Sequence, residues 1–374
     1  MFGVKVRLHP GTTRLILCIC LLFAVICLYT LFLHQYTRLS SRTYIEKDNG
    51  ETVDLYDLFM KGFRLTYKAG QLIKNIKLNN SLIFNKQYKD LFQNLPKEPV
   101  TIADLLSHAI ITNGLKSTFP RVKIVSEEKP SDPISDDQMR LIKSSNRLKN
   151  MPKLPSIERD YTTMVVPLSS VTVWIDPLDA TQEYTENLTD YVMVMFCVAI
   201  EGEPTIGILY APFTEKFVWG WFGVDKSWVD LSQPKHIAQV HEVIVSRSHA
   251  GNIQKILQKI YADEQFEIVP AAGSGYKTLK IIEEQADFYL HVTAIKKWDT
   301  CAPNALLRAH NGHMTTLNNK TIDYKSDNDI VLKDGLLATL KRDHNEVLNK
   351  LNLTNIAAQQ QAEMKKGKNK HKRS

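Results

Sequence analysis

Cysteine is scarce in this chain of 374 residues, and its distribution excludes one structural class. Three of the five cysteines, Cys18, Cys20 and Cys27, lie in one apolar run near the N-terminus, which leaves Cys197 and Cys301 for the rest of the chain. So few cysteines exclude a disulfide framework. Both remaining cysteines have apolar or motif surroundings, and we expect buried structural thiols there rather than a bridge or a nucleophile.

Most of the chain also lacks a strong net charge of either sign. The formal net charge is +7, but six of these charges come from the C-terminal residues Lys365, Lys366, Lys368, Lys370, Lys372 and Arg373. The remainder is nearly neutral, which argues against nucleic-acid recognition by a folded domain. We interpret residues 356–374 as a basic, disordered tail, with attraction to polyanions as the alternative.

One long apolar run, residues 15–33, contains no charged residue. At roughly 1.5 Å per residue, such a helix is long enough to cross a bilayer. A cleaved signal peptide is the alternative, but its apolar region is usually shorter and ends at small residues. We therefore predict a membrane anchor at 15–33, a cytosolic N-terminus at 1–14, a stem at 34–52 and a catalytic body at 53–355.

Asparagine acceptor sites give this anchor an orientation. Asn-x-Ser/Thr triplets begin at Asn79, Asn187, Asn319 and Asn352. Glycosylation takes place on the lumenal side, so these triplets and the anchor together predict a single-pass protein with its body in the lumen. Such triplets also occur by chance in cytosolic proteins, and the four asparagines are candidates only.

The body alternates helical and strand patterns. Apolar periodicity predicts a helix at 53–78, and further helices are expected at 102–119, 253–262 and 276–284. A β-branched run predicts a strand at 171–175, and further strands are expected at 122–125, 191–200, 205–210, 216–221, 242–246, 266–269 and 286–292. The strands between 191 and 221 indicate an antiparallel meander, and the later alternation is typical of an α/β fold. Residues 129–155 are rich in polar residues and proline, which predicts a surface excursion. We expect one layered α/β body, with two lobes and a cleft.

The segment WIDPLDATQEY, Trp174–Tyr184, sets two aspartates three residues apart. We expect the preceding strand to end at Asp176, because Pro177 has no N–H group to donate and should turn the chain. Asp176 and Asp179 then face one point. Residues 181–188 predict a helix capped by Asp179 or Thr181, with its free N–H groups aimed at the same point.

Convergence of the two carboxylates requires a positive partner. Two ionised carboxylates about 4 Å apart repel by roughly 4 kcal/mol at an effective dielectric near 20, so a proton or a cation must offset the repulsion. The motif contains neither histidine nor cysteine. It therefore favours Mg²⁺ held by oxygen atoms over a zinc site. The alternative is a solvated, Asp-rich turn.

A third aspartate, Asp299, lies in KKWDTCAPNALLRAHNG. Pro303 suits the first turn of a helix and Gly312 suits its end, so Asp299 is predicted near a helix start, where an ordinary N-cap is the alternative role. Asn311 precedes Gly312, and asparagine tolerates the left-handed backbone that such a helix end requires.

The order of these motifs resembles the inositol monophosphatase superfamily of lithium-sensitive, Mg²⁺-dependent phosphatases. IADLL with Asp104, SEE with Glu127 and Glu128, DPLDAT and WDTCA follow one another as in that superfamily, over about residues 53–345. The resemblance implies a layered αβαβα sandwich. DATQEYTE, VSRSHAG, AAGSGYK and IKKWD are most similar to its membrane-bound Golgi branch, which removes the 3'-phosphate of 3'-phosphoadenosine 5'-phosphate, a by-product of sulfotransferases, to give AMP and phosphate.

The resemblance also implies a set of metal ligands. Glu127, Asp176 and the carbonyl group of Leu178 would hold one Mg²⁺, and Asp176, Asp179 and Asp299 would hold a second. This set implies two or three ions in all.

The catalytic and substrate-binding residues are implied in the same way. A third, weaker ion would use Glu127 and Asp104. Thr181 and Asp104 would orient and deprotonate the attacking water, with Asp104 as the base. The resemblance assigns the nucleotide to Ser246, His249, Gly273 and Lys277.

Other interpretations remain at this stage. Without the resemblance, His249 reads as a helix cap and Lys277 as a surface residue. The metal motifs do not distinguish leaving groups, so an inositol or sugar monophosphatase is the second hypothesis, and an inactive, membrane-anchored binding protein is the third. The sequence leaves the oligomeric state open, a homodimer included.

Overall fold

The computed structural model describes residues 50–78, 87–89, 98–129, 135–145, 151–229, 231, 240–247, 253–262, 264–325 and 327–352. The predicted anchor, nearly all of the stem, the basic tail, Asn79 and His249 lie outside these residues. Within the described ranges, no helix is long and apolar enough to cross a membrane.

The chain divides into two compact units, residues 1–54 with 160–167 and residues 55–159 with 168–374. In the first unit, β1 (Thr52–Asp54) pairs antiparallel with β5 (Val165–Pro167), and α5 (Tyr161–Met164) precedes β5. The second unit contains both large sheets and every candidate site residue within the described ranges.

A six-stranded sheet crosses the described part of the second unit. Its strands, in spatial order, are β10 (Asp225–Lys226), β9 (Lys216–Trp221), β8 (Glu203–Ala211), β7 (Met193–Ile200), β6 (Val171–Asp179) and β4 (Lys123–Ser126). β4 runs parallel to β6, and the other neighbours are antiparallel. The predicted meander is confirmed, since each strand from β6 to β9 pairs with the next one along the chain.

Strand β6 runs further than predicted. It continues through Pro177 to Asp179, so the expectation of a strand end at Asp176 was wrong. The pairing with β7 shifts register between Asp176 and Asp179. This irregularity accommodates the missing N–H group of Pro177 without ending the strand.

The helix after β6 is shorter than predicted. α6 (Thr181–Thr185) ends before Leu188, and η2 (Thr189–Tyr191) follows. Its N-cap is Ala180, which has a left-handed φ of 69° and makes no side-chain cap. The prediction of Asp179 or Thr181 as the cap was therefore wrong, because the backbone itself turns at Ala180.

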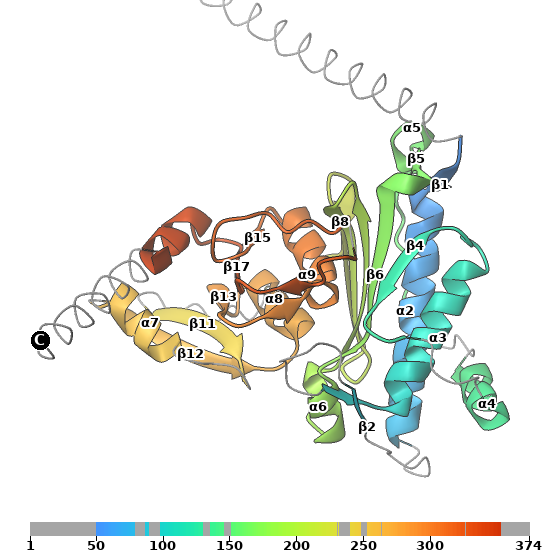
Figure 1. Cartoon of the computed structure of the whole chain (residues 1–374), viewed down its shortest axis with the longest axis horizontal. Coiled ribbons are helices and arrows are strands. Elements are labelled where there is room, and N and C mark those ends of the chain that lie inside the picture. Colours follow the sequence, from blue (N-terminus) through green and yellow to red (C-terminus); the bar gives the residue numbers. More distant parts are fainter. Residues whose placement is uncertain are drawn as a thin grey trace, which may run out of the picture. The chain divides into compact units, whose positions relative to one another are not determined.

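Two long helices cover one face of this sheet (Figure 1). They are α2 (Leu55–Leu78) and α3 (Ile102–Lys116), both of which were expected from the sequence. Glycines allow α2 to approach closely, since a Cβ atom on Gly62 would lie 2.4 Å from the ring of Phe196. Helix α4 (Asp136–Ser145) contacts both α2 and α3. The remaining short elements are β2 (Gln87–Lys89), β3 (Glu98–Val100) and η1 (Leu168–Ser170). The predicted excursion at 129–155 thus contains a helix.

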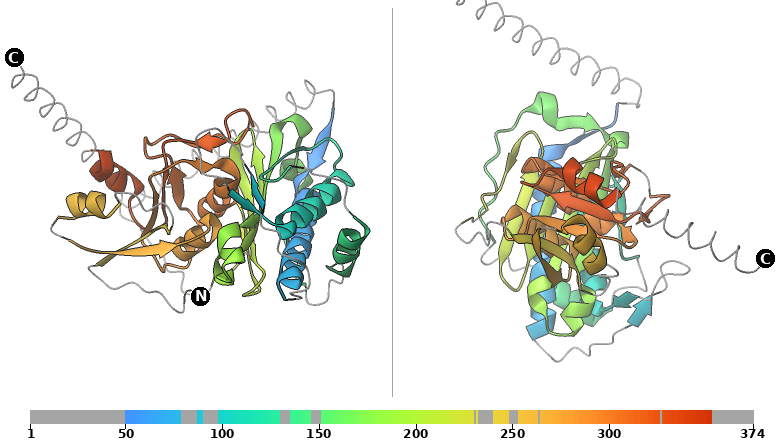
Figure 2. Two further views of the ribbon diagram at one scale, coloured as in Figure 1. Left: turned by 60° about the horizontal axis from the view of Figure 1, so that its bottom comes forward. Right: turned by 90° about the vertical axis from the view of Figure 1, so that its left-hand side faces the viewer.

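A five-stranded sheet lies beyond the opposite face, in the order β12-β11-β13-β17-β15. Its strands are β12 (Gln265–Ala271), β11 (Val240–Ser246), β13 (Phe288–His291), β17 (Leu336–Thr339) and β15 (His313–Thr315). Helices α8 (Ser274–Ile282) and α9 (Lys297–Ala309) lie between the two sheets (Figure 2). A short ribbon, β14 (Ile295–Lys296) with β16 (Val331–Leu332), adjoins α9.

Helix α7 (Ile253–Ile260) and a last helix, 344–352, cover the outer face of the second sheet through a separate apolar core. The order of layers is therefore helices, sheet, helices, sheet, helices. The αβαβα sandwich is confirmed for this unit, and it places α8 and α9 next to β6 and β7.

Two expectations about α9 and its surroundings were wrong. Cys197 on β7 and Cys301 on α9 form a disulfide, although we expected buried thiols. Their apolar neighbours indicated burial. The two cysteines are 104 positions apart in the chain, and only the fold brings their Cα atoms to within 5.7 Å of each other. Pro303 lies inside α9 rather than in its first turn, because the helix already begins at Lys297. The helix end is as predicted, with Asn311 at a φ of 63°.

Candidate active site

Asp104 and Thr181 are brought together from different elements. Asp104 lies at the third position of α3, where its Oδ2 atom accepts hydrogen bonds from the backbone N–H (2.8 Å) and the hydroxyl (2.5 Å) of Thr101. Its other oxygen, Oδ1, accepts a 2.9 Å hydrogen bond from the Thr181 hydroxyl. Burial is the main cause that raises the pKa of Asp104 to about 6. This carboxyl group is therefore fixed in place and able to take up a proton near neutral pH.

The end of β6 supplies the next group of oxygen atoms. Asp176, Leu178 and Asp179 are all buried. The backbone N–H of Leu178 donates to Asp176 Oδ1 at 3.1 Å, and the Leu178 carbonyl oxygen lies 3.0 Å from the Thr181 hydroxyl. The Thr181 hydroxyl has one proton, so it donates either to Asp104 Oδ1 or to the Leu178 carbonyl oxygen.

Asp179 is held by the start of α8. The N–H of Gly275 donates to Asp179 Oδ2 at 2.9 Å. Gly273 has a φ of 67°, and a Cβ atom there would lie 3.0 Å from the same carboxylate oxygen. Glycine at 273 thus lets the backbone approach Asp179 closely.

Asp299 reaches the site from α9. It is the third residue of that helix, and its Oδ2 atom accepts a 3.2 Å hydrogen bond from the N–H of Lys296. Asp104 and Asp299 therefore both lie in the first turn of a helix, where free N–H groups stabilise negative charge. The N-cap alternative was wrong, because Lys296 is the N-cap and Asp299 is the third helical residue. The charge of Asp299 also acts on Asp176.

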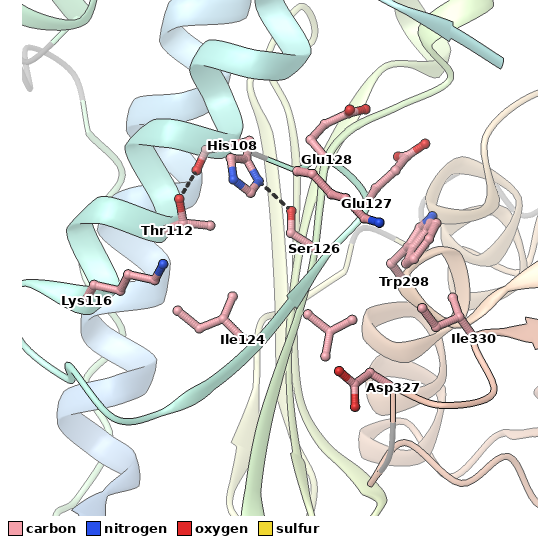
Figure 3. A pocket seen from close by; sticks show the side chains of 12 residues that line it. His108, Thr112, Lys116, Ile124, Ser126, Glu127, Glu128, Trp298, Asp327 and Ile330 are labelled. Atoms are coloured by element: carbon pink, nitrogen blue, oxygen red, sulfur yellow. Dashed lines mark hydrogen bonds between the residues drawn. The ribbon is translucent and has the colours of Figure 1, made fainter. Parts of the chain in front are cut away.

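Glu127 follows β4 and lines a cavity of about 390 Å³. Figure 3 shows Glu127 and Glu128 beside Trp298 at one end of this cavity, with His108 hydrogen-bonded to Ser126. The carboxylate of Glu127 also lies within hydrogen-bonding reach of Asp176. Glu127 is thus accessible to ions from the cavity and part of the same acidic cluster.

Burial and mutual repulsion govern the charges of this cluster. Burial, with the charges of Glu127, Asp179 and Asp299, raises the pKa of Asp176 well above its usual range. Burial raises the pKa of Asp179 to about 6 and that of Asp299 to about 7, and Glu127 adds to both. The cluster holds more negative charge than its surroundings balance.

Hard divalent cations fit this donor set, because every side chain in it offers carboxylate oxygen. In the described ranges, no group of three or more His, Cys, Asp or Glu side chains is already arranged to hold an ion. If the ionised carboxylates are to converge on one point, a positive charge must offset their repulsion, which is one cause of their raised pKa values.

Lys277 lies inside this environment rather than on the surface. Only 3% of it is exposed, its Nζ atom donates to the Gly273 carbonyl oxygen at 2.7 Å, and it lies over the ring of Tyr289. Burial lowers its pKa to about 8, while Asp179 and Asp299 oppose that shift. The surface interpretation of Lys277 was wrong, because α8 turns this side chain toward the acidic cluster.

The remaining predicted substrate residues are only partly described. Ser246 ends β11 and is buried, and His249 lies outside the described residues. Arg247, which our reading of the sequence missed, bridges Glu183 (3.2 Å) and Glu186 (3.1 Å) next to α6. The sequence signal was present in VSRSHAG, where a cation stands between two predicted substrate residues.

Comparisons with known proteins agree with this arrangement. The model of the inositol monophosphatase family matches residues 58–361. Inositol monophosphatase 3 of Danio rerio is 36% identical over 322 residues, which cover 81% of this chain and 86% of that protein. The human Golgi-resident adenosine 3',5'-bisphosphate 3'-phosphatase is 36% identical over 311 residues, which cover 81% and 82%.

A crystal structure shares the fold. CysQ from Bacteroides thetaiotaomicron, a bacterial member of the inositol monophosphatase family, superimposes with a TM-score of 0.54 at 20% identity, covering 77% of this chain and 98% of that one. At that identity, the likeness concerns the fold alone.

Proposed function

Because the chain belongs to the inositol monophosphatase family, we propose that it removes the 3'-phosphate of 3'-phosphoadenosine 5'-phosphate in a Mg²⁺-dependent reaction that gives AMP and phosphate. As a member of this family, the chain is a phosphoric monoester hydrolase. The choice of substrate is supported by the human relative, whose name states a 3'-phosphatase of adenosine 3',5'-bisphosphate.

The observation that carries the nucleotide proposal is the position of Lys277. Its ammonium group is buried and interacts with Asp179 and Asp299. A substrate with a second phosphate brings negative charge beyond that of the reacting group, and a lysine beside the acidic cluster offers a charge to receive it. We propose that Ser246, His249, Gly273 and Lys277 contact the nucleotide.

The metal ligands proposed are Glu127, Asp176, the Leu178 carbonyl group, Asp179 and Asp299, which hold two ions. A third, weaker ion uses Glu127 and Asp104. When bound, Mg²⁺ neutralises the phosphoryl oxygens and the leaving 3'-oxygen.

The proton path runs through the protein. Asp104 Oδ2 is occupied by Thr101, so only Oδ1 is oriented toward Thr181. As the Thr181 hydroxyl passes its proton to Asp104 Oδ1, its oxygen accepts a proton from the attacking water. The raised pKa of Asp104, about 6, suits a base that works near neutral pH. No protein nucleophile is required.

We also propose that the body lies in the lumen of the Golgi, on a single-pass anchor formed by residues 15–33. The buried disulfide between Cys197 and Cys301 supports an oxidising compartment, because disulfides are rare in the cytosol. Asn187 and Asn319 are exposed acceptor candidates. The names of several relatives place those proteins in the Golgi.

A second candidate function is hydrolysis of an inositol monophosphate. The relative from Danio rerio carries that activity in its name at the same identity of 36%. Both substrates would use the same carboxylates, since the metals act on the phosphate group that the two have in common.

Phosphate release distinguishes the two substrates. The chain from residue 40 onward is purified and given 3'-phosphoadenosine 5'-phosphate or inositol 1-phosphate, each with and without Mg²⁺. Turnover of the nucleotide alone, and only with Mg²⁺, is the expected result. Turnover of the inositol ester alone would retain the metal site and overturn the nucleotide assignment, and no turnover of either would favour an inactive binding protein.

A further inference from the structure

The disulfide between Cys197 and Cys301 joins two elements that border the acidic cluster. It joins β7 to α9, and the two cysteines are 1% and 0% exposed. Cys18, Cys20 and Cys27 lie outside the described residues. Because the bond is buried between a sheet and a helix, it connects two layers of the sandwich rather than two surface loops.

Each end of the disulfide is close in the chain to proposed metal ligands. Cys301 follows Asp299 by two residues in the first turns of α9. On β7, Cys197 pairs with Trp174 of β6, and Met195 of the same strand pairs with Asp176. The bond thus links the helix that carries Asp299 to the strand that lies alongside Asp176.

The rest of α9 is attached to other strands. A Cβ atom on Gly207 of β8 would lie 2.4 Å from the Ala302 carbonyl oxygen, and one on Gly220 of β9 would lie 2.7 Å from Ala309. These glycines let α9 lie close to β8 beside Cys301 and close to β9 near its end. The first turn also donates from the N–H of Lys297 to the Ile330 carbonyl oxygen at 2.9 Å. The disulfide adds a covalent link from this end of the helix to β7.

Electrostatic repulsion acts on the same end of α9. Asp299 is close enough to Glu127 and Asp179 for their charges to oppose its ionisation. The charge of Lys296 has the opposite effect on Asp299. The repulsion that remains among ionised carboxylates disfavours the approach of the first turn of α9 to β6 and β4. Trp298, in the same turn, has a buried indole N–H with no hydrogen-bond partner in the described part of the chain, so at this residue the turn depends on packing.

We propose that the Cys197–Cys301 disulfide is a positioning element for metal binding, which holds Asp299 within reach of the carboxylates of β6 against their repulsion. The inference rests on the proposed function, because it requires the acidic cluster to bind Mg²⁺. The two cysteines take no part in the chemistry. Their bond keeps the first turns of α9 ordered before the ion binds, so that ion binding does not have to supply the free energy of ordering them.

The test measures Mg²⁺ binding itself, by isothermal titration calorimetry without substrate. The double variant Cys197→Ala with Cys301→Ala should bind Mg²⁺ at least about fivefold more weakly than the unmodified chain. Leu257→Ala, a buried change on α7 in the separate outer core, controls for general destabilisation and should bind Mg²⁺ normally. Equal affinity of the double variant and the unmodified chain would overturn the inference.

A double-mutant cycle assigns the effect to Asp299. In a chain that carries Asp299→Asn, removal of both cysteines should weaken the residual Mg²⁺ binding no further. An undiminished loss in that background would show that the disulfide acts elsewhere, and would overturn the inference. Absence of Mg²⁺ binding by the unmodified chain would instead overturn the proposed function, so the two failures are distinguishable.

A measurement on the unmodified chain covers the case in which the variants fail to fold. Hydrogen exchange of residues 299–302 should be slow without metal and change little when Mg²⁺ is added, because the disulfide already orders this turn. Fast exchange that becomes slow only with Mg²⁺ would overturn the inference.

Discussion

The side-chain oxygen of Thr181 lies 2.9 Å from Oδ1 of Asp104, although the two residues are 77 positions apart in the chain. The opposite oxygen of Asp104 is held by both the N–H and the hydroxyl of Thr101, which form the cap of α3. One oxygen of this carboxyl group thus takes part in the cap at the start of α3, and the other accepts a hydrogen bond from the Thr181 hydroxyl. This division of roles explains how a buried aspartate with a raised pKa is kept in a single orientation.

Loss of the Thr181 hydroxyl should therefore impair turnover more than folding. Thr181→Val preserves the shape of the side chain but breaks the path between water and Asp104, and we expect kcat to fall by about 10²- to 10⁴-fold. Thr181→Ser retains the hydroxyl and should keep most of the activity. Steady-state phosphate release checks both variants, and equal losses in the two would contradict the proton path.

Removal of one carboxylate at the end of β6 should separate activity from stability. Asp176→Asn takes away a proposed ligand of both ions, so turnover should fall by at least about 100-fold. The same change also replaces an acidic group whose ionisation the buried, metal-free site disfavours with a neutral amide of similar shape. The melting temperature of the metal-free protein should consequently stay the same or rise, as calorimetry can measure. A variant that retains its activity would refute the metal scheme.

Local patterns in the sequence predicted several of the helices and strands, whereas the order of the layers came from the family resemblance. The 3.6-residue periodicity indicated α2, and the β-branched run before Asp176 indicated β6. These patterns report which face of an element is buried, and burial is what the fold preserves.

The errors concern features that depend on contacts between distant segments. Pro177 remains within β6 because a register shift against β7 removes the need for its N–H group, and only the partner strand reveals that shift. The pairing of Cys197 with Cys301 likewise required the position of α9 over β7. Without the family resemblance, Lys277 would be interpreted as a surface residue, but the layer between the two sheets buries it.

Gly273 offers a test of the contact between α8 and Asp179. Gly273→Ala places a Cβ atom 3.0 Å from the Asp179 carboxylate at a φ of 67°, so we expect weaker Mg²⁺ binding in calorimetry. Gly223→Ala is the matched control, because its φ is 76° and nothing lies within 4 Å of the added atom. Both changes place an alanine at a positive φ, where an L side chain is strained, but only the first should alter Mg²⁺ affinity.

Lys277 should discriminate between the two candidate substrates. Lys277→Met removes the charge and keeps the alkyl chain, so kcat/KM for 3'-phosphoadenosine 5'-phosphate should fall on the order of 10- to 100-fold, and far less for inositol 1-phosphate. Lys280→Met on the same helix removes a cation that pairs with Glu283, and both substrates should be turned over normally. Equal losses for the two substrates in Lys277→Met would show that the nucleotide assignment is wrong.

The acidic cluster should make the stabilising effect of Mg²⁺ depend on pH. In the metal-free protein the pKa of Asp179 is about 6 and that of Asp299 about 7, both above the ordinary value of 3.8. Between about pH 5 and pH 8 the folded state therefore binds more protons than the unfolded state, and the free energy of unfolding contributed by these groups falls as the pH rises.

Mg²⁺ replaces those protons, so the rise in melting temperature on adding a fixed concentration of Mg²⁺ should be small near pH 5 and largest near pH 8. His310 and His344 act in the opposite direction, since burial lowers the pKa of each to about 4, but they act equally with and without the metal and cancel in the difference. Calorimetric scans with and without Mg²⁺ at several pH values measure this difference directly. A shift that does not vary with pH would mean that Mg²⁺ does not bind at these carboxylates, because an ion that displaces protons from groups of raised pKa must bind more weakly as those groups become protonated.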